Sequence, residues 1–244
     1  VSVKEYLGQE VVPNSGCGNW LLEGQSTNLI TQSENFSDAS WNLKSEISIL
    51  SNNGVSPDGT LNADKIIPST INATHYIGVS SQPISGHNYS VFVKSDGYDW
   101  ILLTSHITSA VGTRGTYFNI NNGTIGTIGS AGQNPKIENY GNGWYRCSID
   151  EGDAPSSLFG VFVVNQDNAT NFQGDGVSGV YLWGAEREAG SHPTSYIPTQ
   201  GASSTRLQDI ATNSGNASLI NSEEGTLYGE IAVNEGQTNV NRYI

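Results

Sequence analysis

The chain has 244 residues, of which 36% are hydrophobic and 14% are charged, and it contains 29 glycines. This composition argues against coiled coils and long helices and favours many short strands joined by polar turns. Ten Lys and Arg against 23 Asp and Glu give a formal net charge of −13. Nucleic acid and anionic membrane surfaces are therefore disfavoured as partners, because both need basic residues, and no apolar run reaches the roughly 18 residues that membrane insertion requires.

The chain begins with a turn-rich stretch, residues 1–24, which we interpret as a lead-in from a preceding region. Alternation of apolar and polar residues then predicts a series of strands, separated by turn sequences such as Pro57-Asp58-Gly59. Eight or so strands at this spacing predict an all-β protein, an antiparallel β-sandwich or barrel. The predicted strands are residues 45–50, 62–67, 87–94, 99–105, 115–120, 143–149, 158–164 and 179–187.

The end of the chain is predicted to leave this sandwich. Residues 191–205 carry two prolines and several small polar residues, which is typical of an extended linker. Residues 225–233 then start a new alternating strand. We therefore divide the chain into the lead-in, a β-sandwich over residues 25–210, and residues 211–244, which are the start of a second, truncated β-domain or an extra hairpin on the first.

Motifs for catalysis are missing from the sequence. The four histidines form no zinc-binding pattern, and no nucleophile elbow of the serine-hydrolase type occurs. Glu186 and Glu188 share one face of a predicted strand, but a solvated or ligand-binding face explains such a pair as well as a glycosidase site does. The oxygen-rich loop 165–175 could supply ligands to a structural calcium ion, or it is a plain polar loop. We expect no enzymatic activity.

Two cysteines, Cys17 and Cys147, are too few for a disulfide framework. Cys147 falls on the apolar side of its predicted strand, together with Tyr145 and Ile149. We therefore predict a buried thiol at Cys147 that packs as a small hydrophobic group. Cys17 lies in a glycine-flanked turn outside the sandwich, and we expect the two thiols to be unpaired.

Aromatic and polar side chains on the strands suggest a ligand-binding face. Strand alternation places them opposite the better core candidates, whereas Trp183 shares the predicted core face with Tyr181 and Ala185. An exposed Trp144 could stack on a sugar ring, while Arg146 and Glu186 bind its hydroxyls. In the alternative, Trp144 caps the end of the core and the face is merely polar. The candidate ligand-binding residues are Phe92, Lys94, Trp144, Arg146 and Glu186.

Four stretches carry motifs of a known family: residues 26–41, 56–65, 143–148 and 181–200. Together they resemble a module of bacteriophage tail fibre and tail-associated proteins. This module is similar to the carbohydrate-binding modules that accompany xylanases and glucanases. The resemblance implies a jelly-roll β-sandwich with a concave glycan-binding face, and a structural calcium in many relatives. The family has Gln where this chain has Glu186, and an apolar residue at Arg187, which would point inward unless the strand ends or bulges. Residues 219–244 resemble the start of a laminin-G-like or concanavalin-like domain.

The expected function follows from the resemblance and from the polar strand face. We expect a non-catalytic glycan-binding and adhesion module of a tail fibre or similar virion protein, located in the virion tail or outside the cell. Its expected partners are a bacterial surface glycan and other tail subunits, including copies of itself in a homotrimer. Two alternatives stay open: an accessory carbohydrate-binding module of a secreted polysaccharide-degrading enzyme, and a purely structural fibre spacer.

Overall fold

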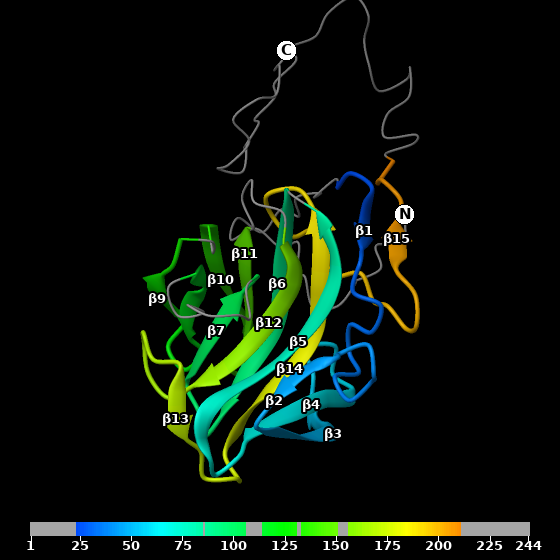
Figure 1. Cartoon of the computed structure of the whole chain (residues 1–244). Helices are drawn as coiled ribbons and strands as arrows, with labels where there is room; N and C mark the ends of the chain where they lie inside the picture. Colours follow the sequence, from blue (N-terminus) through cyan, green and yellow to red (C-terminus); the bar gives the residue numbers. More distant parts are fainter. Residues whose placement is uncertain (1–22, 85, 106–113, 131–132, 151–155, 211–244) are drawn as a thin grey trace, which may run out of the picture. The chain divides into compact units, whose positions relative to one another are not determined.

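The structure is a computed structural model that describes residues 23–84, 86–105, 114–130, 133–150 and 156–210 (Figure 1). Contacts divide the chain into two units, residues 1–208 and 209–244, and the fold belongs to the first unit. The predicted second β-domain, residues 211–244, and all but the last two residues of the predicted lead-in lie outside the described residues.

The first unit is an all-β sandwich of antiparallel sheets, as the alternating sequence predicts. The jelly-roll connectivity stays a prediction. One large sheet has six strands in an order that is far from their order in the sequence, so its neighbours come from distant parts of the chain. In spatial order these are β10 (Gln133–Gly141), β11 (Trp144–Asp150), β6 (His87–Asp96), β14 (Gly179–Ala189), β4 (Leu61–Pro68) and β3 (Ile47–Val55).

The second large sheet has seven strands and lies in front of the first in Figure 1. Its main path is β13 (Asn171–Gln173), β5 (Asn72–Ile84), β12 (Ser156–Val164), β7 (Trp100–Thr104), β8 (Thr116–Asn119) and β9 (Thr124–Ile128). The short strand β2 (Leu43–Ser45) pairs with β5 off this path. A separate two-stranded ribbon joins β1 (Ser26–Asn28) to β15 (Ser204–Arg206).

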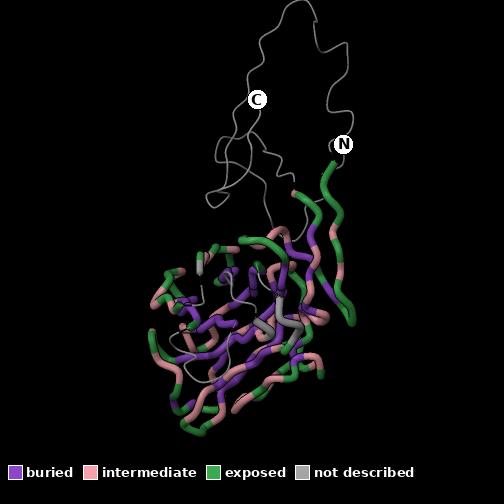
Figure 2. Tube along the Cα trace, turned by 45° about the horizontal axis from the view of Figure 1, so that its top comes forward, coloured by how far each residue is buried: buried purple, intermediate pink, exposed green. Residues whose placement is uncertain are grey.

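The main hydrophobic core fills the space between the two large sheets, and Figure 2 shows buried residues running along the middle of the strands. Every second residue of a strand points into this core. On β6, Val91 and Val93 face the core, and on β12, Val161 and Val163 do the same from the other sheet. Cys147 belongs to this core, is fully buried and carries a free thiol, so the prediction for that residue is confirmed. Cys17 lies outside the described residues.

Residues 191–200, which we call the closing segment, pack back onto the six-stranded sheet. Tyr196 and Ile197 are 3% exposed, and Thr199 is also buried. The interpretation of this stretch as a linker that leaves the sandwich was therefore wrong. Prolines do not stop such a segment from packing, because its apolar side chains and backbone groups find partners on the sheet.

Asn28 joins the N-terminal strand to the closing segment. Its side-chain amide donates to the carbonyl oxygens of Ala185 (3.1 Å) and Ile197 (2.9 Å). Its side-chain oxygen accepts from the backbone N–H groups of Ile30 (3.0 Å) and Arg187 (3.2 Å). One buried side chain thus satisfies four backbone groups from three segments, which matters because an unpaired buried backbone group is costly.

A β-bulge in β14 reverses the alternation of that strand. Trp183 lies opposite Phe92, but Glu186 lies opposite Ser90, so β14 has one extra residue here. Gly184 has a φ of 59°, in the left-handed region that glycine adopts at low cost. After the bulge, Ala185 and Arg187 are on the side of the main core, so Arg187 points inward. Its guanidinium lies over the ring of Tyr89, 5.3 Å from the ring centre.

The bulge also separates residues that simple alternation had placed together. Trp183 lies on the face of the six-stranded sheet that points away from the main core, whereas Ala185 belongs to the main core. The prediction that both share the core face with Tyr181 was therefore wrong. Trp183 is nevertheless fully buried, in a second group that we call the outer cluster: Ala63, Phe92, Trp144, Trp183 and Tyr196.

Candidate functional site

Four of the five predicted ligand-binding residues are buried. Phe92, Trp144 and Arg146 are 2% exposed and Glu186 is not exposed, while Lys94 is half-buried. The prediction that this face is open to solvent was therefore wrong, and so are the stacking and hydrogen-bonding roles that depended on it. One physical reason is the closing segment, whose Tyr196 packs on Trp183 and Phe92 with ring centroids 4.5 and 6.0 Å away. Another is strand β3, where the carbonyl oxygen of Val55 accepts from the indole N–H of Trp144 at 3.0 Å.

Arg146 and Glu186 form a buried pair that holds the closing segment to the sheet. The Nη2 of Arg146 contacts the Oε2 of Glu186, and its Nη1 donates to the carbonyl oxygen of Thr194 at 2.8 Å. The other carboxylate oxygen of Glu186 accepts from the backbone N–H of Ile197. The guanidinium also lies 5.3 Å from the ring centre of Phe92. These groups therefore hold the closing segment against the sheet, and they do not make the predicted contact with sugar hydroxyls.

Burial raises the pKa of Glu186 to about 8, although the charge of Arg146 opposes the rise. The folded protein therefore binds a proton that the unfolded chain, with an ordinary glutamate pKa, releases between about pH 4.5 and 8. Glu186 stabilises the fold fully below that range and progressively less as the pH rises through it.

We expect the free energy of unfolding, measured with urea, to fall from pH 5 to pH 8, and Glu186→Gln to reduce this fall. An equal fall in Glu186→Gln and wild type would contradict the assignment, and the exposed Glu138→Gln is the control.

A polar cleft of about 610 Å³ opens beside the β3–β4 hairpin, within the size range of ligand-binding sites. Three separate stretches of the chain form it: the segment after β1, the hairpin, and the end of the closing segment. All but one of its lining residues carry a polar side-chain group, and none is Lys, Arg or His. They are Gln32, Glu34, Asn35, Ser37, Ser51, Asn52, Asn62, Asp64, Pro198, Thr199 and Gln200.

Paired contacts between the first and last of these stretches fix one wall of the cleft. Gln32 and Gln200 face each other in an isolated antiparallel bridge. Beside them, the hydroxyl of Thr199 accepts from the N–H of Ser33 (3.0 Å), and the hydroxyl of Ser33 accepts from the N–H of Thr199 (2.9 Å). The indole N–H of Trp41 donates to the carbonyl oxygen of Gln32 at 2.8 Å. The backbone of this wall is therefore held firmly, while the two glutamine side chains form no hydrogen bond to any residue that the structure describes.

Asp64, one of the two carboxylates of the cleft, binds backbone groups on both sides of it. Asp64 is 1% exposed and accepts from the backbone N–H groups of Phe36 and Asn52, both at 2.9 Å. It thus joins the segment after β1 to strand β3, and these two elements flank the cleft. Burial raises the pKa of Asp64, and those two hydrogen bonds oppose the rise.

Glu34 is the accessible carboxylate of the cleft and is half-buried. One of its oxygens accepts from the hydroxyl of Tyr196 (2.9 Å) and the other from the amide of Asn62 (3.1 Å). Burial raises the pKa of Glu34, and the nearby charge of Asp58 adds to the rise.

Three primary amides in the cleft are available to a ligand. Within the described part of the chain, the side chains of Gln32, Asn52 and Gln200 make no hydrogen bond. A primary amide offers two donors and an acceptor, which suits adjacent hydroxyl groups of a sugar. Sequence reasoning missed these residues, although they lie in or next to the stretches that carry the family resemblance, 26–41, 56–65 and 181–200. Those stretches meet at the cleft only in three dimensions.

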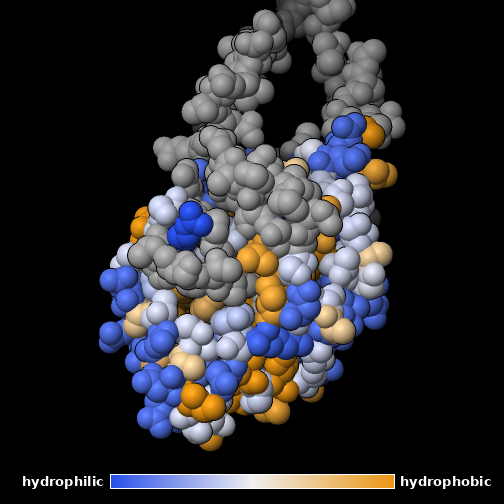
Figure 3. Space-filling model, viewed as in Figure 1, coloured by the Kyte–Doolittle hydropathy of each residue, from blue (hydrophilic) through white to orange (hydrophobic). Residues whose placement is uncertain are grey.

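The outward face of the seven-stranded sheet carries an aromatic row. Tyr76, Phe162, Leu102 and Tyr117 are direct cross-strand neighbours on β5, β12, β7 and β8. Phe162, Leu102 and Tyr117 are fully buried, whereas Tyr76 and Trp100, at the rim, are half-buried. Figure 3 shows this side of the molecule as a mixture of polar and apolar side chains. The rim is the second place where a sugar ring could stack.

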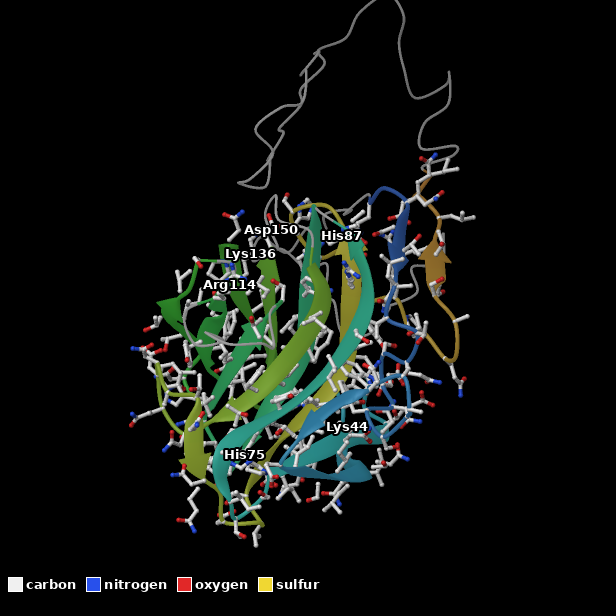
Figure 4. The ribbon with its side chains drawn as sticks, in the orientation of Figure 1. Lys44, His75, His87, Arg114, Lys136 and Asp150 are labelled. Atoms are coloured by element: carbon white, nitrogen blue, oxygen red, sulfur yellow. The ribbon has the colours of Figure 1, made fainter. Side chains whose placement is uncertain are left out.

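No metal centre is defined by the residues that the structure describes, where no group of three or more His, Cys, Asp or Glu side chains could hold an ion. In the predicted calcium loop, Asp167 accepts from the N–H and the hydroxyl of Thr127 at 2.9 and 3.1 Å. His75, near the lower end of the sandwich in Figure 4, lies between the carbonyl oxygens of Glu46 and Phe172 at 2.6 and 2.9 Å. Both side chains hold loops in place.

Comparison of the chain with protein-family models and with curated protein sequences found no match. The class of the protein is thus defined by its geometry, an antiparallel all-β sandwich with a polar cleft at one edge. Among the described residues, no helix has the length and apolar character that crossing a bilayer would demand.

Proposed function

We propose that residues 25–210 form a non-catalytic glycan-binding and adhesion module, and that the polar cleft holds the glycan. The observation that carries this proposal is the set of unengaged amides of Gln32, Asn52 and Gln200 in a cleft of ligand size. Apolar ligands have little to contact there, since only Pro198 lacks a polar side-chain group. Polyhydroxylated ligands match the lining, because each amide can both donate to and accept from a hydroxyl.

The biological setting within this proposal is the tail fibre of a bacteriophage or a similar virion protein. Bacterial surface polysaccharide is the proposed ligand, and other tail subunits, in a homotrimer for example, are the proposed partners. Support for the setting comes from the resemblance of the motifs at residues 26–41, 56–65, 143–148 and 181–200. An accessory module of a secreted polysaccharide-degrading enzyme would use the same cleft chemistry. The cleft favours either of these over a structural spacer, which needs no unengaged polar groups.

The hydrogen bonding of the cleft carboxylates supports a non-catalytic role. Glycoside hydrolysis needs one carboxyl group that donates a proton and another that acts as nucleophile or base. Both oxygens of Asp64 accept backbone N–H groups, and both oxygens of Glu34 accept side-chain donors. We expect no release of reducing ends from bacterial polysaccharides, measured by a reducing-sugar assay. Release that disappears in Glu34→Gln, or in Glu186→Gln or Glu188→Gln, would contradict this proposal.

Binding to an array of purified bacterial surface polysaccharides tests the glycan proposal. We expect at least one ligand with a Kd in the micromolar to millimolar range, about 4–8 kcal/mol per module, raised by avidity in an oligomer. Replacing both Gln32 and Gln200 by alanine is expected to weaken that binding at least about tenfold. The exposed Gln166→Ala is the matched control. Absence of binding to every polysaccharide, or loss in Trp100→Ala but not in the double variant, would overturn the cleft as the site.

A further inference from the structure

The cleft carries negative charge that no ion pair among the described residues neutralises. Glu34 and Asp64 line it, and Asp58 is close enough to raise the pKa of Glu34. Among the described residues none of these three carboxylates forms an ion pair. Ion pairs lie elsewhere in the fold, for example Lys65–Asp96, Arg146–Glu186 and Arg206–Glu23.

Lys44 is a basic residue that contacts the cleft wall. Its ammonium donates to the carbonyl oxygens of Ser37 and Asp38 at 3.3 and 3.4 Å, and its side chain is exposed (Figure 4). Lys44 thus binds backbone and does not line the cleft, although its charge opposes the rise that burial causes in the pKa of Asp64. A ligand in the cleft would meet carboxylates and neutral amides.

We propose that the cleft binds a sugar with a protonated amino group, and that the carboxylate of Glu34 accepts a hydrogen bond from that group. This inference rests on the proposed glycan-binding function. Asp64 is buried and contributes its charge, whereas Glu34 is accessible from the cleft. Hydrogen bonds between ionised partners are about twice as strong as those between neutral ones. The amides of Gln32, Asn52 and Gln200 then bind the ring hydroxyls.

The same charges exclude acidic sugars. A uronic acid or a phosphorylated sugar would place a second negative group beside Glu34 and Asp58, with no basic residue in the lining to receive it. Like-charge contact in a partly buried site disfavours binding. N-acetylation of the amino sugar removes its charge and keeps its size, so the acetylated sugar is the sharpest neutral comparison.

Three tetrasaccharides test the proposal in calorimetric titrations at about pH 6 and low salt, with a chelator present: tetraglucosamine, its fully N-acetylated form, and tetragalacturonate. Under these conditions the amines are largely protonated. We expect tetraglucosamine to bind at least about tenfold more tightly than the acetylated form, and tetragalacturonate to bind most weakly. Added salt should reduce the preference, because it screens the charge contact.

Variants of two kinds locate the preference in the cleft. Glu34→Gln should abolish the advantage of tetraglucosamine, whereas Glu138→Gln, at an exposed position on β10, should retain it. Ser51→Lys adds a positive charge at an exposed rim residue without touching the network of Glu34, and it should reverse the order of tetraglucosamine and tetragalacturonate. This second variant keeps the test valid if Glu34→Gln fails to fold.

The outcomes separate this inference from the function on which it rests. Equal or tighter binding of the acetylated or acidic tetrasaccharide overturns the inference. If that binding is weakened by alanine at Gln32 and Gln200, the glycan-binding function of the cleft stands. Failure of all three tetrasaccharides to bind also overturns the inference, and the polysaccharide array then decides the function separately.

Discussion

Replacing Glu186 by alanine is expected to lower the free energy of unfolding by about 3–5 kcal/mol, the cost of leaving the buried guanidinium of Arg146 without its partner. The change removes the acceptor of the Arg146 guanidinium and leaves the N–H of Ile197 without its carboxylate partner. Both groups are buried, so water cannot replace the lost oxygens without opening the closing segment. The loss should therefore be far larger than for any surface glutamate.

Urea denaturation followed by tryptophan fluorescence measures this effect. The control is Glu138→Ala, which removes a glutamate from β10, directly opposite Arg146 in the strand register, but at an exposed position. We expect this control to change stability by less than about 0.5 kcal/mol. A loss below about 1 kcal/mol in Glu186→Ala would mean that the pair does not hold the closing segment.

Asn28→Ala is expected to cost at least about 4 kcal/mol, because four backbone groups lose their partner and each buried unpaired group costs about 1–3 kcal/mol. Asn28 is not exposed, so the carbonyl groups of Ala185 and Ile197 lose their donor in a site closed to bulk water. The same change frees the N–H groups of Ile30 and Arg187. The N-terminal strand and the closing segment should therefore loosen together.

Hydrogen exchange measured by mass spectrometry reports this loosening, alongside urea denaturation. In Asn28→Ala, peptides that cover residues 26–34 and 191–200 should exchange faster than in wild type. Asn165→Ala, an exposed asparagine on a loop, is the matched control and should leave both peptides unchanged. Unchanged exchange in Asn28→Ala would show that other contacts hold these segments.

The sequence predicts most of the long strands because alternate residues of each face the main core, which gives short apolar or alternating runs bounded by turn residues. Residues 87–94 and 158–164, for example, fall inside β6 and β12, whose alternate residues face the main core. β5 was missed, although Ile77 and Val79 pack at the core, because Gly78 and several small polar residues weaken its apolar pattern.

The binding face could not be predicted from alternation alone. Alternation correctly places Phe92, Trp144 and Arg146 opposite the main core, but it says nothing about what covers that face. The covering element is the closing segment, whose prolines and polar residues are typical of a linker. A bulge at Gly184, which changes the face of every later residue of β14, also leaves no clear pattern in the sequence.

The cleft was beyond sequence reasoning for a similar reason. Gln32, Asn52 and Gln200 are ordinary polar residues in turn-rich stretches, and up to 168 positions separate them. Their meeting depends on the bridge between Gln32 and Gln200 and on the two elements that Asp64 joins. Only the clustering of the resemblance motifs at both ends of the module pointed to these stretches.

The location of a bound saccharide tests the central claim most directly. In ¹⁵N-labelled protein, NMR resolves the side-chain amides of Gln32, Asn52 and Gln200 in the cleft and the indole N–H of Trp100 at the rim of the aromatic row. During titration with a saccharide that the array identifies as a ligand, we expect saturable shifts of the three amide resonances and none of the Trp100 indole. Shifts of the Trp100 indole with unchanged cleft amides would place the glycan on the seven-stranded sheet instead of in the cleft.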